Sequence, residues 1–413
     1  MSFAGSSSVS VTVISNIFHP DQLGGAALMT DLALFLRDRG YQVSVVSTFP
    51  YYPRWEVAPE DRGVWVRTDE MEGIPVRRVW MYVPSTPSTI RRMFSDLSYF
   101  LSLSLAGRKA WRKADVIITT CPMFSQMVAM RVAHPFGRTI PKLAIVQDFV
   151  VDAALELKMI KNPLVGFLLR KLERWAFRSC DVITTISREM LTKLEGITGP
   201  DRRTLFVPNW IHKSLAEAIE SCRALEVPRK NGLLYYSGNV GRKQGLPQFL
   251  EGFEGTASGW RLKVNGGGAD FERLIKSAAG RADVELSPLQ GEAAFIEALN
   301  SCTACLVTQR PGVGANFLPS KILPALASGT PILAICERDS PLAREVTEAN
   351  CGEVADWSDS GALNAILRKW SDNPKLLWEY ARNSLVRAAR YERGVVLQQY
   401  LTEIEALVKC RKG

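Results

Sequence analysis

The sequence of 413 residues has three histidines, no Asp-x-Asp pair, and no apolar run near the roughly 18 residues that a membrane-spanning helix needs. Scarce histidine argues against His-based zinc sites and Ser-His-Asp hydrolysis. Without an Asp-x-Asp pair, a divalent metal on a diphosphate lacks its usual ligands, so we expect no metal and no other cofactor. The first residues lack a basic segment and a long apolar one, so we expect no signal peptide.

The eight cysteines are scattered along the chain, mostly in apolar surroundings. With no export signal, we interpret them as reduced thiols of a cytosolic protein. Cys302 and Cys305 form a single Cys-x-x-Cys pair. Because a zinc site of this kind needs a second pair, a packing role is the stronger interpretation.

The formal net charge of +9 is uneven. Residues 1–210 hold 26 Lys and Arg against 19 Asp and Glu, whereas the remainder holds 25 against 23. A basic first half indicates an anionic surface or acceptor near it, and a solvated face is the alternative. Hydrophobic residues make up 46% and charged residues 23%, which is typical of globular proteins, and the length fits two domains.

Apolar, β-branched runs alternate with helical stretches along the whole chain. The expected strands lie at 11–15, 43–47, 76–80, 115–120, 143–147, 181–186, 233–237, 262–265, 284–287, 304–308 and 331–335. This alternation predicts an α/β protein of two doubly wound, parallel-sheet, Rossmann-like domains facing a cleft. We expect the domains at 1–210 and 211–390. A helix over 391–413 either packs back on the first domain or caps the second.

Loops after strands are the candidate binding sites, because ligands of open parallel sheets bind beyond the carboxyl ends of the strands. The first such loop carries Asp21, Gly24 and Gly25. Adjacent glycines at a strand-to-helix turn let a ligand approach the backbone, and Asp21 is an acid at the mouth. The alternative is a tight turn with a capping aspartate.

Three loops of the second half suit a phosphorylated or nucleotide-linked molecule. Residues 236–245 combine three glycines with two cations before a helix, which favours a diphosphate. Residues 266–268 are a glycine triplet after a strand. Residues 308–321 form a long polar loop with Ser320 as the expected N-cap of the next helix. Ordinary turns are the alternative for each.

Six stretches stand in a characteristic order. They are His19-Pro20-Asp21 with Gly24, Pro50-Tyr51-Tyr52-Pro53, Val146-Gln147-Asp148-Phe149, Val207-Pro208-Asn209-Trp210, residues 236–245, and Pro319-Ser320-Lys321 with 326–331. With them the chain resembles glycosyltransferases of family 4 with the GT-B fold, and more narrowly their bacterial colanic acid biosynthesis group. The resemblance implies metal-independent, retaining transfer of a sugar from a nucleotide-diphosphate donor to a polyprenyl-diphosphate-linked saccharide in exopolysaccharide biosynthesis. It also implies a cytoplasmic enzyme, peripherally associated with the inner leaflet through its basic first domain, without a nucleic acid partner.

The resemblance also implies roles for single residues. Asp21 would orient or deprotonate the acceptor hydroxyl, Lys243 would neutralise the leaving diphosphate, and Asn316 would face the donor sugar. The donor-binding residues would be Gly238, Asn239, Gly241, Arg242, Gln244, Gly266, Gly267, Gly268, Gln290, Gln309, Ser320 and Lys321. Those on the acceptor side would be Gly24, Gly25, Gln147 and Asp148.

The chain departs from the family pattern in three places. The usual Arg and Lys of the diphosphate loop align better with Asn239 and Gln244 here, so Lys243 as the cation is our own inference. The two glutamates that many members carry eight residues apart are Asn316 and Pro324 here, and the common His-Asp pair reads Gln147-Asp148. The nucleotide base therefore cannot be carried over. A nucleotide-sugar epimerase and a non-catalytic nucleotide-sugar-binding subunit stay as alternatives. The segment 93–113, apolar between basic ends, is either an interfacial membrane helix or a buried helix.

Overall fold

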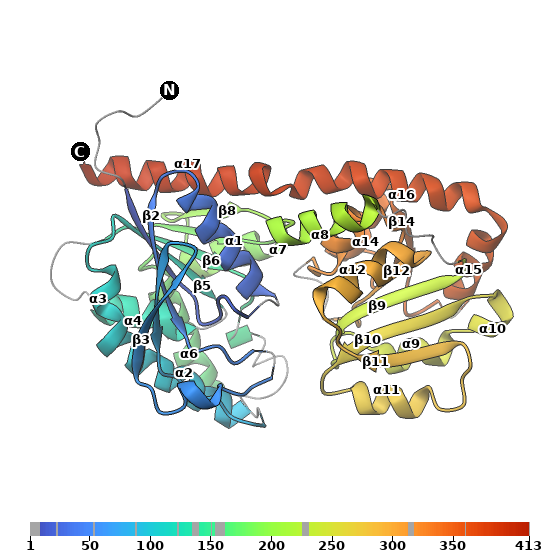
Figure 1. Cartoon of the computed structure of the whole chain (residues 1–413), viewed down its shortest axis with the longest axis horizontal. Helices are drawn as coiled ribbons and strands as arrows, with labels where there is room; N and C mark the ends of the chain where they lie inside the picture. Colours follow the sequence, from blue (N-terminus) through green and yellow to red (C-terminus); the bar gives the residue numbers. More distant parts are fainter. Residues whose placement is uncertain are drawn as a thin grey trace. The chain divides into compact units, whose positions relative to one another are not determined.

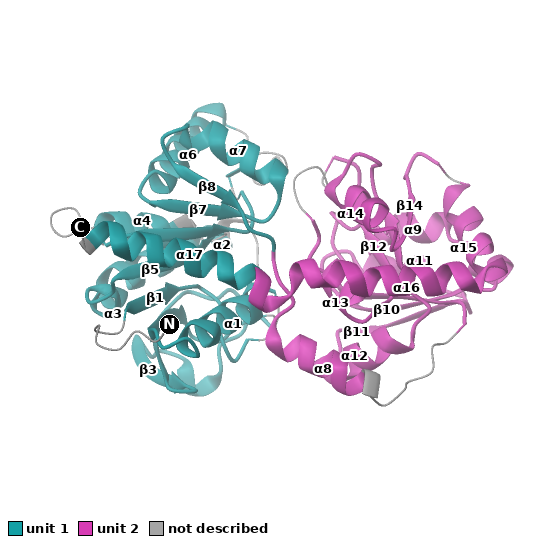
Figure 2. Cartoon of the chain, turned by 90° about the horizontal axis from the view of Figure 1, so that it is seen from above, with its two compact units in different colours: residues 1–208, 396–413 teal, residues 209–395 magenta. Residues whose placement is uncertain are grey.

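The computed structural model describes residues 9–21, 24–52, 54–86, 89–121, 124–133, 140–149, 151–152, 162–224, 231–312, 318–359 and 361–412. The chain divides into two compact units, shown in separate colours in Figure 2. Unit 1 comprises residues 1–208 and 396–413, and unit 2 comprises residues 209–395. The sequence had placed this boundary at residue 210.

Unit 1 is built on an eight-stranded sheet (Figure 1). In spatial order its strands are β3 (Val66–Met71), β4 (Ile74–Val79), β2 (Gln42–Thr48), β1 (Ser10–Ile14), β5 (Val116–Cys121), β6 (Lys142–Val146), β7 (Val182–Thr185) and β8 (Arg203–Phe206). Neighbouring strands run parallel except β3 and β4, which form an antiparallel pair at the edge. Strands β1 and β5 are buried almost throughout, as apolar strands are when helices cover both faces of a parallel sheet.

The helical elements of unit 1 fill the connections between these strands. They are α1 (Gly25–Arg37), the 3₁₀ turn η1 (Pro59–Asp61), α2 (Thr89–Ser102), the π-helical turn η2 (Leu103–Gly107), α3 (Arg108–Trp111), α4 (Phe124–Ala133), α6 (Pro163–Phe177) and α7 (Arg188–Thr198). The long closing helix α17 (Arg393–Lys412) joins this unit from residue 396 onward. Its Glu403 accepts a hydrogen bond from Arg203 of β8 at 2.6 Å, and its Tyr400 hydroxyl lies 3.4 Å from Thr184 Oγ1 of β7.

Unit 2 is built on a six-stranded, all-parallel sheet. In spatial order its strands are β11 (Val284–Pro288), β10 (Arg261–Gly267), β9 (Leu233–Asn239), β12 (Ala304–Thr308), β13 (Ile332–Ile335) and β14 (Gly352–Ala355). Its helical elements are α8 (Lys213–Ala224), α9 (Leu246–Gly252), α10 (Gly255–Ser258), α11 (Phe271–Ser277), α12 (Glu292–Ser301), α13 (Ile322–Ala327), α14 (Pro341–Ala349), α15 (Ala362–Asp372), α16 (Pro374–Ala388) and η3 (Ala389–Tyr391). The rings of Trp260 and Trp370, both fully buried, pack 5.8 Å apart in its core.

Each sheet has one point where the order of its strands reverses. Strand β1 pairs with both β2 and β5, and strand β9 pairs with both β10 and β12. Open parallel sheets bind ligands outside the carboxyl ends of the strands at such switch points. The loops after β1 and β5 in unit 1, and after β9 and β12 in unit 2, therefore hold the candidate sites.

Candidate functional site

Lys321 extends from the start of α13 to the carboxyl end of β9. Its ammonium donates a hydrogen bond to the Tyr236 hydroxyl and another, at 3.3 Å, to the Asn239 carbonyl oxygen. Burial lowers the pKa of Lys321 to about 7. Within the described part of the chain, no carboxylate forms an ion pair with this ammonium. The site therefore holds a desolvated cation whose partners are neutral, which an anionic ligand would complement.

Three glycines let the backbone pack closely at the carboxyl ends of β9 and β10, and one of them lies against Lys321. A Cβ on Gly238, whose φ is 119°, would lie 2.9 Å from the Lys321 ammonium nitrogen. A Cβ on Gly266 would meet Val240 Cγ2 at 2.7 Å, and one on Gly268, whose φ is 135°, would meet the Val240 carbonyl oxygen at 2.7 Å. Side chains are thus excluded at these positions by the protein itself.

Gly267 differs from its two neighbours, because a Cβ added there would meet no atom within 4 Å. It pairs with Asn239 in the β9–β10 register, and its carbonyl oxygen accepts a hydrogen bond from Val240 N at 2.8 Å. No packing requirement within the described residues explains a glycine here. Open space over the backbone of Gly267 is what a flat ligand would need.

The turn after β9 is held by its own amides. Gln244 Oε1 accepts hydrogen bonds from Gly241 N at 3.1 Å and from Asn239 Nδ2 at 3.4 Å. Lys243 is half-buried and Arg242 is exposed, and the Lys243 carbonyl oxygen accepts a hydrogen bond from Arg310 N at 2.9 Å. The backbone of this turn is fixed at both ends, which leaves its two cationic side chains available to a ligand.

The segment after β12 differs from the arrangement that the sequence predicts. Gln309 is buried, and its carbonyl oxygen accepts a hydrogen bond from Trp357 Nε1 at 2.6 Å. Ser320 is exposed and is not the N-cap: α13 begins after Lys321, and no side chain caps it. Gln290 is exposed beyond the end of β11. Asn316 lies outside the described residues.

In unit 1, Asp21 follows β1 at the switch point. Burial raises the pKa of its carboxyl to about 6, although the backbone N–H of Tyr52 donates a hydrogen bond to Asp21 Oδ2 at 3.4 Å. A carboxyl group with a pKa close to neutral suits a general base. The geometry is therefore compatible with the role that the sequence suggested for Asp21.

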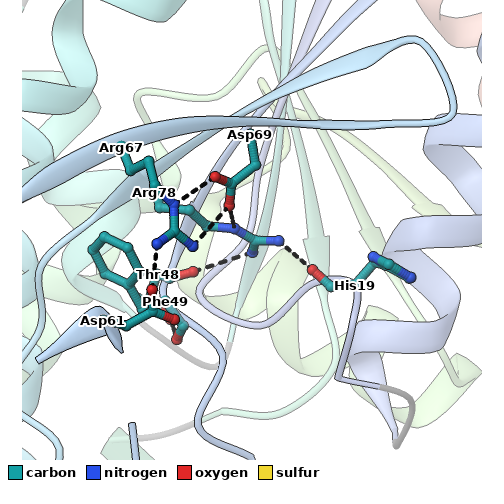
Figure 3. Close-up of polar contacts among 7 residues, drawn as sticks. All are labelled: His19, Thr48, Phe49, Asp61, Arg67, Asp69 and Arg78. Carbon is teal, nitrogen blue, oxygen red and sulfur yellow. Dashed lines mark hydrogen bonds and ion pairs between the residues drawn. The ribbon is translucent and has the colours of Figure 1, made fainter. Parts of the chain in front are cut away.

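Arg78 of β4 supports the loop that carries Asp21 (Figure 3). This buried guanidinium donates hydrogen bonds to the carbonyl oxygens of His19 and of Thr48, the latter at 3.2 Å, and pairs with Asp69 at 3.3 Å. One side chain thus ties the loop after β1 to the end of β2. The sequence does not predict this role, because an arginine inside a strand gives no signal of its function.

The other residues expected on the acceptor side lie on different structural elements. Gly24 caps α1 with a φ of 60°, and Gly25 is the first residue of that helix. Gln147 is half-buried after β6, and its N–H donates to the Cys121 carbonyl oxygen at 3.0 Å. Asp148 is exposed.

A second acidic group near Asp21 was also missed. Asp96 of α2 accepts a hydrogen bond from Ser125 at 2.8 Å, and burial raises the pKa of its carboxyl to about 6. Asp21 and Asp96 both act electrostatically on Tyr51, whose pKa burial raises to about 12. Two carboxyl groups whose pKa burial raises therefore act electrostatically on one tyrosine of unit 1.

The segment expected at 93–113 is amphipathic rather than wholly buried or wholly exposed. Tyr99 and Trp111 are buried, whereas Phe94 and Leu105 are exposed to 58% and 70%. Helix α6 presents a second apolar surface. Its exposed apolar residues are Leu164, Val165, Phe167, Leu168, Leu172 and Trp175. Both helices pack against α4 in unit 1.

Neither a membrane span nor a metal site is found in the part of the chain that the structure describes. No helix among those residues combines the length and the apolar character needed to cross a bilayer. Nor do three or more His, Cys, Asp or Glu of the described ranges come together as metal ligands. The candidate sites therefore consist of backbone amides, cationic side chains and buried carboxyl groups.

Known proteins resemble this chain in sequence and in structure. The Glycosyl transferase 4-like domain family matches residues 24–210. The chain is 30% identical over 334 residues to WcaI of Escherichia coli strain K12, whose name assigns it to colanic acid biosynthesis, with 76% of this chain and 79% of WcaI covered. This similarity confirms the resemblance that the sequence motifs indicated.

Solved structures support the fold. Sucrose-phosphate synthase from Thermosynechococcus elongatus superposes with a TM-score of 0.71 at 15% identity, covering 97% of this chain and all of that one. Anabaena HepE, solved with UDP and glucose, gives a TM-score of 0.65 at 12% identity, covering 96% and 100%. The predicted architecture of two parallel-sheet domains is confirmed. This chain belongs to the glycosyl transferase 4-like family and is a glycosyltransferase of the GT-B fold.

Proposed function

We propose that this enzyme transfers a sugar, with retention at the anomeric carbon, from a nucleotide-diphosphate donor to a saccharide carried on polyprenyl diphosphate. The product would be an exopolysaccharide precursor, as the name of the relative WcaI suggests for that protein. Unit 2 binds the donor, and unit 1 binds the acceptor. The observation that carries the proposal is the desolvated Lys321 ammonium, which has neutral hydrogen-bond partners at the switch point of unit 2.

The diphosphate of the donor complements the charges in this region. Lys321 contacts one phosphate at the carboxyl end of β9. Lys243 and Arg242 approach the diphosphate from the turn after that strand. Gly267 leaves room for the nucleoside above the strand end. Related support comes from HepE, a protein of the same fold that was solved with UDP and glucose.

The chemistry follows from where charge develops. The bond between the anomeric carbon and the diphosphate oxygen breaks, and its electron pair leaves with the phosphate. Lys321 and Lys243 stabilise this charge more in the transition state than in the ground state, and that difference accelerates the reaction. The acceptor oxygen then bonds to the anomeric carbon, while Asp21 orients the hydroxyl and takes its proton.

The acceptor lipid would bring the enzyme to the anionic inner leaflet. Exposed cations stand beside the exposed apolar residues of α2 and α6, among them Arg91, Arg92, Arg170 and Lys171. Apolar side chains flanked by cations favour binding at an anionic bilayer surface, without any span. We therefore propose peripheral association of a cytoplasmic enzyme with the membrane through unit 1.

A thermal-shift panel of GDP, UDP, dTDP and ADP, followed by transfer to a polyprenyl-linked saccharide, tests the proposed function. A nucleotide at 100 times its dissociation constant should stabilise the protein by about 2.7 kcal/mol. We expect one nucleotide to raise the melting temperature and its sugar derivative to support transfer. Stabilisation without transfer would favour the non-catalytic subunit, and interconversion of the sugar without transfer would favour the epimerase.

A further inference from the structure

A cavity of about 550 Å³ opens in unit 1. It lies between the segment after β2 and the segment after β4, with η1 along one side. Its volume is within the roughly 300–1,000 Å³ typical of small-molecule sites. Nothing in the proposed chemistry uses this cavity.

Aromatic side chains form much of the lining. Trp55, Trp80, Tyr82 and Phe49 all contribute to it. Trp65 stacks on Trp80 with the ring centroids 5.5 Å apart, which fixes the orientation of the Trp80 ring. Trp55 has a φ of 56°, a left-handed conformation that is unfavourable for a bulky residue and that tends to occur at functional sites.

Charged groups complete the lining, and the surrounding structure holds most of them in place. Asp61 is buried and pairs with Arg67, whose guanidinium also lies 5.2 Å from the centroid of the Phe49 ring (Figure 3). Arg62 pairs with Glu56 at 2.7 Å. Arg54 is exposed and forms no ion pair among the described residues. The cavity therefore combines fixed aromatic rings with hydrogen-bonding groups and one available cation.

This combination matches the chemistry of a pyranose ring. One face of such a ring presents aliphatic C–H groups that pack on an aromatic surface, and its rim presents hydroxyls that bond to carboxylates and guanidinium groups. A purely apolar ligand would leave the Arg54 guanidinium without a partner, and a nucleic acid would meet carboxylates at Asp61 and Glu56.

The cavity is connected to the loop that carries Asp21 by hydrogen bonds. Arg78 donates hydrogen bonds both to the carbonyl oxygen of Thr48, which lines the cavity, and to that of His19 (Figure 3). The backbone N–H of Tyr52, on the segment that leads to Trp55, in turn donates to Asp21. Cavity and carboxylate are therefore linked through the segments that follow β1, β2 and β4.

We propose that this cavity binds a pyranose ring of the acceptor other than the one that receives the transferred sugar. This inference rests on the proposed function, because it assigns the acceptor at least two sugar rings. The cavity would then select acceptors by a sugar remote from the reacting hydroxyl, and it would leave the donor untouched.

Saturation-transfer NMR on the full chain tests the proposal with methyl glucopyranoside, methyl galactopyranoside, methyl fucopyranoside and methyl glucuronide as probes. We expect saturation transfer to at least one of them. Trp80→Leu and Tyr82→Ala should each reduce it by roughly fivefold or more, as loss of a central aromatic contact does. Trp378→Ala, which removes an exposed tryptophan of unit 2, is the matched control and should leave the signal unchanged.

Tyr82→Ala keeps the test decisive if Trp80→Leu does not fold. The Tyr82 side chain is 37% exposed and makes no hydrogen bond among the described residues, since only its backbone N–H bonds to Ser98. Equal signals in wild type and Tyr82→Ala, or no signal for any probe, would overturn the inference. Nucleotide binding measured on the same samples separates this failure from that of the proposed function, because the cavity variants should bind the donor normally.

Discussion

The Lys321 ammonium donates a hydrogen bond to the hydroxyl of Tyr236 and lies 3.9 Å from the centroid of the same ring. A tyrosine on a buried strand thus holds a cation at the carboxyl end of β9. Because both contacts are neutral, the charge is positioned but not neutralised. This pair makes unit 2 ready for an anion before any ligand arrives.

Replacing Lys243 with alanine should lower turnover by roughly 100- to 1,000-fold, by analogy with the loss of one charge-stabilising donor. The fold should be intact, because among the described residues Lys243 forms a hydrogen bond through its backbone carbonyl and none through its side chain. Single-turnover transfer measures the loss, and Lys276→Ala, an exposed lysine of α11, is the control. Near-normal transfer by Lys243→Ala would remove that residue from the site.

Substitutions in the glycine triplet should distinguish glycines that the fold requires from a glycine that ligand binding requires. Gly268→Ala should lower the melting temperature, because its Cβ would collide with the Val240 carbonyl oxygen in a backbone conformation that alanine rarely adopts. Gly267→Ala should leave the melting temperature unchanged and weaken nucleotide binding, since its Cβ enters open space. Calorimetric titration with nucleotide checks both variants. Unaltered affinity in Gly267→Ala would mean that no ligand approaches this strand end.

The transfer rate should depend on the ionisation of Asp21. A base must be ionised to accept a proton, and burial raises the pKa of this carboxyl to about 6. The value of kcat/KM should therefore fall as pH decreases through about 6, and it should fall again above about pH 7, where Lys321 loses its proton. Asp21→Asn should lower kcat by roughly 100-fold or more and abolish this acidic limb. Asp38→Asn, which removes an exposed carboxyl at the end of α1, should retain the wild-type pH profile. If kcat/KM of Asp21→Asn still fell at acidic pH, that fall would belong to another titrating group.

Membrane association should depend on the exposed faces of α2 and α6. Phe94→Ser with Leu97→Ser, or Phe167→Ser with Leu168→Ser, should reduce sedimentation with vesicles that contain phosphatidylglycerol, because each pair removes exposed apolar surface. Trp378→Ser with Val386→Ser removes comparable surface from unit 2 and serves as control. Equal sedimentation of all variants would exclude these helices. Trp111 is unsuitable for this test, because it is fully buried.

The sequence predicted the alternating fold well, because the strands of a doubly covered parallel sheet are nearly continuous apolar runs. It missed β3, β8 and β14, which all lie at an edge of their sheet, where a strand need not be a continuous apolar run. The exposed residues of β3, for example, include Arg67 and Glu70. It also ended β9 and β10 too early. Gly238 and Gly266 face each other in the β9–β10 register, so the glycine loops begin inside the sheet.

The candidate site was only partly predictable. Glycines and cations after strands marked the turn at 236–245, because those residue types have few other reasons to gather there. Tyr236 and Arg78 gave no signal, since a tyrosine in a strand is typical of a core and a lone strand arginine is typical of a solvated face. Their roles depend on partners 85 and 59 residues away along the chain, which only the fold brings together.

Calorimetric titration of nucleoside diphosphates across pH tests the central claim, which is that Lys321 binds the diphosphate of the donor without a metal ion. Burial lowers the pKa of this ammonium to about 7, so the free protein loses the charge as pH rises above that value. We predict that the wild-type Kd rises by about tenfold per pH unit above pH 7, in the presence of a chelator, and that Lys321→Met binds weakly at every pH. Absence of binding by the wild type, or an affinity that is the same in Lys321→Met, would contradict the account.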